Sequence, residues 1–113
     1  MPTGSARKLV KKLRAWADKR FPVTFPVRCY VRKSSSMEDY NGYFLMGEGE
    51  SATIAISDDL THGEIVSTFL EEWAHARTAH LTDWEHDGDD PHHHPTFWAE
   101  LGRITVAARG EVW

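Results

Sequence analysis

The sequence is poor in cysteine, in long apolar runs and, beyond its first third, in basic residues. Cys29 is the single cysteine, so no disulfide can form within the chain and no cluster of thiolates can bind a metal. A metal site would therefore depend on histidine, aspartate and glutamate. No stretch approaches the roughly 18 consecutive apolar residues of a membrane span, and the first residues lack the apolar core of a secretory signal. We therefore expect a cytoplasmic protein.

The scarcity of basic residues after residue 33 divides the chain into two halves of opposite charge. Residues 1–33 hold ten Lys and Arg and one acid, a net charge of +9, whereas residues 34–113 hold three basic residues and sixteen acids, a net charge of −13. A concentration of basic residues can bind nucleic acid or another acidic partner. It can equally pair with the acidic half of the same chain, and composition does not choose between these partners.

The 113 residues suffice for a single domain with one modest core. Apolar periodicity predicts helices over residues 5–19, 61–80 and 96–109, and strands over residues 25–33, 43–46 and 52–57. A glycine-rich turn at residues 47–50 predicts that the last two strands form a hairpin. The fold class is therefore α+β over residues 1–113, with an N-terminal helix, a small three-stranded, mainly antiparallel sheet, two further helices and an Asp- and His-rich loop between them.

The second predicted helix has a clear start and an unusual polar group. Thr61 and Glu64 have the spacing of a capping box, in which each side chain satisfies a backbone N–H of the first turn. Further along, Glu71 and His75 are four residues apart and share one helix face, with Glu72 beside them. This face lies opposite the apolar stripe, so one hypothesis is a solvated face with an ion pair worth a few tenths of a kcal/mol.

The other hypothesis depends on two stretches of sequence. They are Phe69-Leu70-Glu71-Glu72-Trp73-Ala74-His75-Ala76, and His93-His94-Pro95-Thr96-Phe97-Trp98 followed by Gly102-Arg103-Ile104. Together they resemble the small SprT-like zinc metallopeptidases, including short phage-encoded relatives, over roughly residues 60–105. In that family a helix carries His-Glu-x-x-His and a third histidine comes from the segment that enters the next helix.

The resemblance implies a minimal zincin fold and a metal-dependent peptidase. Its metal ligands would be Glu71, His75 and His93, around Zn²⁺ or another divalent ion, and Glu72 would be the general base that takes a proton from the attacking water. The substrate would be a protein or peptide. A phage-encoded relative would act in the host cytoplasm, and the family implies substrates near DNA.

The sequence departs from the family pattern at the first ligand, where Glu71 replaces a histidine. A carboxylate is an ordinary zinc ligand, and two histidines with one carboxylate form a known catalytic set. An anionic ligand nevertheless makes the metal a weaker Lewis acid. The alternative is therefore a catalytically inactive protein that keeps the fold and acts as a binding or inhibitor protein on a protein or nucleic-acid partner.

Several residues outside the motif helix remain alternatives for metal binding or partner binding. His92 and His94 are alternatives to His93, and Asp87, Asp89 and Asp90 could bind a hard cation, although the spacing does not fit a twelve-residue calcium loop. We expect Glu100 to be an exposed helix acid, with a role as replacement ligand as the alternative, and Trp98 to join the core. A nucleic-acid partner would contact the basic residues of the first helix, namely Arg7, Lys8, Lys11, Lys12 and Arg14.

Overall fold

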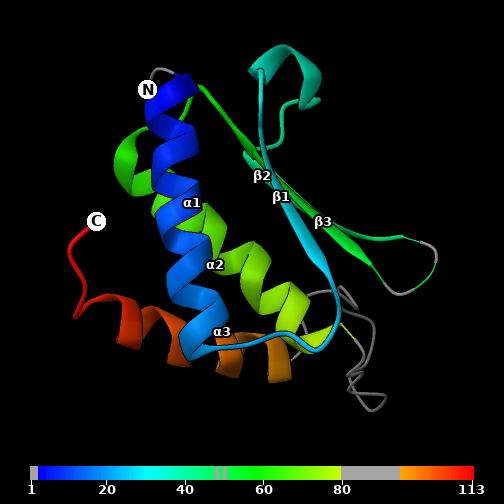
Figure 1. Cartoon of the computed structure of the whole chain (residues 1–113), viewed down its shortest axis with the longest axis vertical. Helices are drawn as coiled ribbons and strands as arrows, with labels where there is room; N and C mark the ends of the chain where they lie inside the picture. Colours follow the sequence, from blue (N-terminus) through cyan, green and yellow to red (C-terminus); the bar gives the residue numbers. More distant parts are fainter. Residues whose placement is uncertain (1–2, 48, 50, 80–94) are drawn as a thin grey trace.

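The computed structural model describes residues 3–47, 49, 51–79 and 95–113, which form helices on one side of a three-stranded sheet (Figure 1). The elements are α1 (Thr3–Arg20), β1 (Val27–Arg32), a short 3₁₀ turn η1 (Ser34–Ser36), β2 (Gly42–Met46), β3 (Ala52–Ser57), α2 (His62–Thr78) and α3 (Pro95–Ala108). The predicted α+β class is confirmed, and the helices and strands lie where the periodicity placed them.

The sheet has the order β1-β3-β2 and is mixed. The predicted hairpin is confirmed, because β2 and β3 are antiparallel and the Gly47 N–H donates to the Ser51 carbonyl at 2.7 Å. β1, however, pairs with β3 in parallel, with Cys29 opposite Ile54. The expectation of a mainly antiparallel sheet is therefore wrong.

The amino-acid pattern of each strand explains this order. In β3 five of six residues are buried, including Ile54 and Ile56 with no exposed surface. A central position suits such a strand, because pairing at both edges satisfies its backbone and keeps its apolar side chains from water. β1 instead alternates Cys29 and Val31 with exposed Arg28, a pattern typical of a strand with one solvated face.

One face of the sheet is covered by α1, which packs on β1, and by α2, which packs on β2 and β3 (Figure 1). α2 also contacts α1 and α3, so it lies at the centre of the molecule. Its Trp73 has no exposed surface, and the indole N–H donates to the Phe21 carbonyl at 2.8 Å. Because that carbonyl belongs to the segment between α1 and β1, the bond holds this connecting segment against α2.

Two other expectations have opposite outcomes. The capping box at the start of α2 is confirmed, since the Thr61 side chain accepts from the Glu64 N–H and the Glu64 carboxylate accepts from the Thr61 N–H. Trp98 is not a core residue, because 56% of its surface is exposed and the buried side of α3 is formed by neighbours such as Phe97. Among the described residues, no helix is both long and apolar enough to cross a membrane.

Candidate functional site

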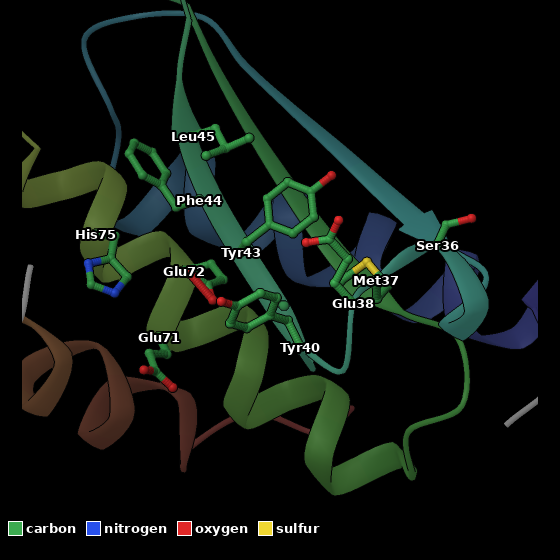
Figure 2. A pocket seen from close by; sticks show the side chains of 11 residues that line it. Ser36, Met37, Glu38, Tyr40, Tyr43, Phe44, Leu45, Glu71, Glu72 and His75 are labelled. Atoms are coloured by element: carbon green, nitrogen blue, oxygen red, sulfur yellow. The ribbon is translucent and has the colours of Figure 1, made fainter.

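A cavity of about 680 Å³ runs along β2, between α2 and the segment that follows η1 (Figure 2). The helix contributes the three residues that the sequence singled out, Glu71, Glu72 and His75. The opposite wall comes from β2 and from the chain before it. These further lining residues are Ser36, Met37, Glu38, Tyr40, Gly42, Tyr43, Phe44 and Leu45.

The face of α2 that carries Glu71 and His75 is covered by the sheet rather than solvated. Thr68, one turn before, is only 9% exposed, and both Glu71 and His75 are partly buried. The close approach of β2 depends on Gly42, where an added Cβ would lie 2.6 Å from the Thr68 methyl carbon. The hypothesis of a solvated helix face is therefore wrong, because it took no account of a strand packed on that side.

Glu72 is the most shielded ionisable group of the cavity, with 7% of its surface exposed. It leaves the same stretch of helix as Glu71 and His75, and all three reach the cavity (Figure 2). A carboxylate in such a position is protected from bulk water, which strengthens its interaction with any proton donor or cation that enters. The structure therefore brings the expected general base and two of the expected metal ligands to one cavity.

The imidazole of His75 lies between two aromatic rings. Its centroid is 4.2 Å from that of Phe97 on α3, with 21° between the planes, and 6.4 Å from that of Phe44 on β2, with 26° between the planes. These contacts restrict rotation of the imidazole. His75 is therefore held in one orientation at the junction of α2, α3 and β2.

The third expected ligand, His93, lies outside the described residues, as do its alternatives His92 and His94. The same holds for the aspartates 87, 89 and 90, which were considered for a hard cation. Within residues 3–47, 49, 51–79 and 95–113, no three His, Cys, Asp or Glu side chains are grouped closely enough to hold a metal ion. The described part of the site therefore supplies Glu71 and His75 as possible ligands and leaves the third to the segment before α3.

The backbone of β2 borders the cavity and forms an outer edge of the sheet. The Gly47 N–H donates to the Ser51 carbonyl and the Ser57 N–H donates to the Asn41 carbonyl, at the two ends of the β2–β3 ladder. These two bonds show which positions between them are hydrogen-bonded across the pair and which are not. In an antiparallel pair, the intervening non-bonded positions direct their N–H and C=O groups away from the partner strand. On β2 these positions include Phe44 and Met46, so their backbone groups face outward, where an extended peptide can pair with them.

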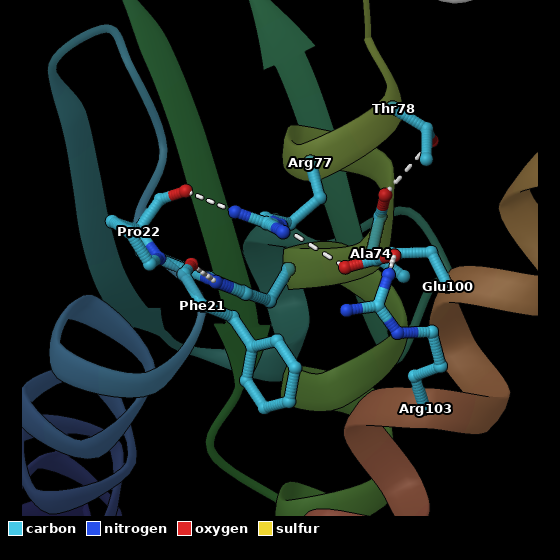
Figure 3. Close-up of polar contacts among 8 residues, drawn as sticks. Phe21, Pro22, Ala74, Arg77, Thr78, Glu100 and Arg103 are labelled. Atoms are coloured by element: carbon cyan, nitrogen blue, oxygen red, sulfur yellow. Dashed lines mark hydrogen bonds and ion pairs between the residues drawn. The ribbon is translucent and has the colours of Figure 1, made fainter.

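Glu100 is not an exposed acid, contrary to expectation. Only 8% of its surface is accessible, and its two carboxylate oxygens each accept a hydrogen bond at 3.0 Å, one from Arg77 and one from Arg103 (Figure 3). Arg77 also donates to the Pro22 carbonyl. With both oxygens engaged by guanidinium groups, Glu100 has a structural role that joins α2, α3 and the segment before β1.

The segment between η1 and β2 contributes cavity residues that the sequence did not indicate. Met37 is 2% exposed and anchors this segment, while Glu38 and Asp39 adopt positive φ angles of 50° and 67°. Tyr40 follows and its N–H donates to the Met37 carbonyl at 2.9 Å. Met37 is an apolar residue within the polar stretch 34–41, and this was the only sign in the sequence that the stretch is anchored to the fold. The pattern does not show that the stretch would line a cavity opposite α2.

The basic residues of α1 lie mostly at the surface. Arg7, Lys8, Lys11 and Lys12 are exposed, whereas Arg14 is partly buried and its Nε lies 3.0 Å from the Asp18 carboxylate. The expected nucleic-acid contacts are therefore accessible for the most part. They stay a prediction, because surface position alone does not identify a partner.

Comparison with known proteins gives no relative: no family model, no curated protein and no solved structure matches the chain. The resemblance to SprT-like metallopeptidases therefore remains an expectation that depends on the quoted residues. We therefore infer function from the residues that line the cavity.

Proposed function

We propose that this protein is a metal-dependent peptidase-like protein that binds an extended peptide along β2. The observation that carries the proposal is the position of Glu71, Glu72 and His75 in one cavity beside the outward edge of that strand. A strand edge offers backbone hydrogen bonds to any peptide. A peptide bound there would lie next to a shielded carboxylate and two possible metal ligands of the same cavity.

The residues present suit a divalent metal ion such as Zn²⁺. Glu71 and His75 are four residues apart on α2, are both partly buried and both line the cavity, and carboxylate oxygen and imidazole nitrogen are common zinc donors. His93 would complete the set from the segment before α3. When bound, such an ion polarises a carbonyl and lowers the pKa of water.

Glu72 would act as the general base in this site. Its carboxylate is shielded at the cavity wall, where it can accept the proton of an attacking water and later return it to the leaving amine. The outward N–H and C=O groups of Phe44 and Met46 would hold the peptide extended. Orientation by the strand edge and proton transfer by Glu72 are thus separate contributions of this chain.

A second candidate function is a catalytically inactive binding or inhibitor protein. The observation that favours it is the aromatic packing of His75, whose ring lies 4.2 Å from that of Phe97. Such packing accounts for a histidine at this position without any metal. The replacement of the first histidine of the SprT-like motif by Glu71 also favours a site that has lost its metal. The cavity and the β2 edge would then bind a peptide segment of a partner protein without cleaving it.

Zinc stoichiometry of the untagged protein tests the metal site. We expect one ion per chain in native mass spectrometry, and loss of that ion in Glu71→Ala and in His75→Ala. His62→Ala is the matched control, because His62 is an exposed residue of the same helix and its loss should leave the stoichiometry at one. Absence of bound zinc in the natural protein at excess zinc would exclude the metal-dependent function.

Hydrolysis separates the two candidate functions once metal binding is known. Glu72→Gln should keep the zinc and lose peptidase activity by about 100-fold or more, as expected for removal of a general base. The substrate is an unstructured protein such as casein, cleaved in zinc-containing buffer. A protein that binds zinc, shows no cleavage and still binds peptide at β2 would support the second candidate and contradict the first.

A further inference from the structure

A second surface of the molecule, remote in sequence from the cavity residues of α2, combines positive charge with an exposed aromatic ring. A groove of about 450 Å³ lies between α1 and β1. Its basic lining residues are Arg7, Lys11 and Arg14. Tyr30 lines it from β1, with 41% of its surface exposed.

Little of this charge is neutralised within the described part of the molecule. Of the ten basic residues before residue 34, only Arg14 and Arg20 lie within 4.0 Å of a carboxylate among the described residues. Arg14 pairs with Asp18 at 3.0 Å, and Arg20 with Glu111 at 4.0 Å. Within the described residues, pairing with the acidic half of the chain, one of the two possibilities that composition allowed, thus accounts for few of these charges.

β1 extends the basic surface beyond the groove. Arg28, Tyr30 and Arg32 are all exposed and alternate with Cys29 and Val31, which face the helices. Successive outward residues of a strand are about 6.6 Å apart, so the two arginines flank the ring on one sheet face. The Arg32 guanidinium carbon lies 5.9 Å from the centroid of Tyr30, so one of the two flanking cations lies close to the tyrosine ring.

We propose that this surface, formed by Arg7 and Lys11 of α1 and by Arg28, Tyr30 and Arg32 of β1, binds single-stranded nucleic acid. The four cations contact backbone phosphates, and a base stacks on the tyrosine ring. Grooves that bind single strands combine these two elements, because phosphates repeat along the chain and every base has a face that stacks. The exposed ring between arginines favours a nucleic acid over an acidic protein segment, which offers charge and no base to stack.

This binding site is independent of the proposed peptidase-like function, because it shares no residue with the cavity along β2. The whole protein carries a net charge of −4, so general attraction to a polyanion is not expected. Binding would therefore reflect a local surface rather than total charge.

Fluorescence anisotropy with a labelled oligothymidylate tests the proposal on the full chain. With four phosphate contacts, log K should fall with log salt at a slope of about −2.8, which is about a fifty-fold loss of affinity between 50 and 200 mM salt. Arg28→Gln should reduce the slope by about 0.7. Arg109→Gln, which alters an exposed arginine at the end of α3, is the matched control and should leave both affinity and slope unchanged.

The stacking contact is tested by Tyr30→Leu, which keeps the charges and removes the aromatic ring. We expect affinity to fall on the order of tenfold with an unchanged salt slope. Equal losses for Arg28→Gln and Arg109→Gln would overturn the assigned surface, as would undetectable binding at 50 mM salt. Poly-glutamate that competes as well as oligothymidylate would show an acidic protein ligand instead and contradict the proposal.

Discussion

Arg77 and Glu100 join α2 to α3 through an ion pair in which the guanidinium Nε lies 3.0 Å from a carboxylate oxygen (Figure 3). The Glu100 side chain is 10% exposed and that of Arg77 26%. Glu100 also accepts from Arg103, one turn further along α3. Phe97, which packs on His75, is three residues before Glu100 on α3. The ion pair therefore helps to fix the helix that orients the histidine of the candidate site.

Removing the carboxylate charge should lower stability. We expect Glu100→Gln to reduce the free energy of unfolding by about 2 kcal/mol, because the partly buried Arg77 and the more exposed Arg103 both lose the charge of a largely buried carboxylate. Urea unfolding followed by tryptophan fluorescence measures this loss. Asp18→Asn is the matched control: it breaks an exposed pair with Arg14 and should cost about 0.5 kcal/mol. Equal effects of the two changes would contradict a special role for Glu100.

Gly42 should not tolerate a side chain. We expect Gly42→Ala to destabilise the protein by about 1–3 kcal/mol, because its Cβ would lie 2.6 Å from the Thr68 methyl carbon and 3.0 Å from the Ala55 carbonyl oxygen. Thermal or urea unfolding measures the change. Gly102→Ala is the control, since this glycine lies inside α3 with open space around it and alanine should stabilise the helix by about 0.8 kcal/mol.

A second change tests the cause of that effect. Thr68→Ser removes the methyl carbon that the new Cβ would meet, so it should recover part of the loss in the Gly42→Ala background. The double-mutant cycle then gives a favourable coupling between the two positions. Simple additivity of the two changes would show that β2 and α2 do not meet at this point.

The capping box makes stability depend on pH. The pKa of Glu64 is lowered, chiefly because its carboxylate accepts a hydrogen bond from the Thr61 backbone N–H. Hydrogen bonding with the Thr61 side chain lowers the same pKa further. A group with a lowered folded pKa stabilises the fold fully above its unfolded pKa, near 4.3 for glutamate, and loses this contribution as pH falls through the folded value. The natural protein should therefore exceed Glu64→Gln in stability near neutral pH.

Urea midpoints across a pH series measure this contribution. The difference between the natural protein and Glu64→Gln should shrink as pH falls from about 5 to below 4. Glu38→Gln is the control for an exposed glutamate outside the capping box, in the segment before β2. A constant difference for Glu64→Gln across the series would contradict a charge-dependent cap.

The alternation of hydrogen bonds on β2 predicts different effects of proline at adjacent positions. Leu45 lies opposite Thr53 at a bonded position of the ladder, whereas Met46 directs its N–H outward. Leu45→Pro should cost about 3 kcal/mol and Met46→Pro clearly less, because proline removes a bond only at the first site. Urea unfolding measures both changes. If the proposed peptide pairs with β2, Met46→Pro should also weaken its binding while the fold persists.

The sequence alone predicted the elements of this fold because their signals are local. Apolar residues three and four apart identified the helices, alternation identified β1, and the Thr61 and Glu64 spacing identified the start of α2. The glycine-rich turn likewise identified the hairpin of β2 and β3. Each of these features depends on neighbours within a few residues, so the sequence contains the full information for them.

Tertiary structure decided the features that depend on distant partners. Local pattern could not show that β3 lies between β1 and β2, that Gly42 lets β2 cover the Thr68 face of α2, or that Glu100 is buried by two arginines. The spacing of Glu71, Glu72 and His75 placed them on adjacent parts of one helix. Only the packing of β2 on that helix turned them into the wall of a cavity, because burial and strand order are set by contacts between residues far apart in the chain.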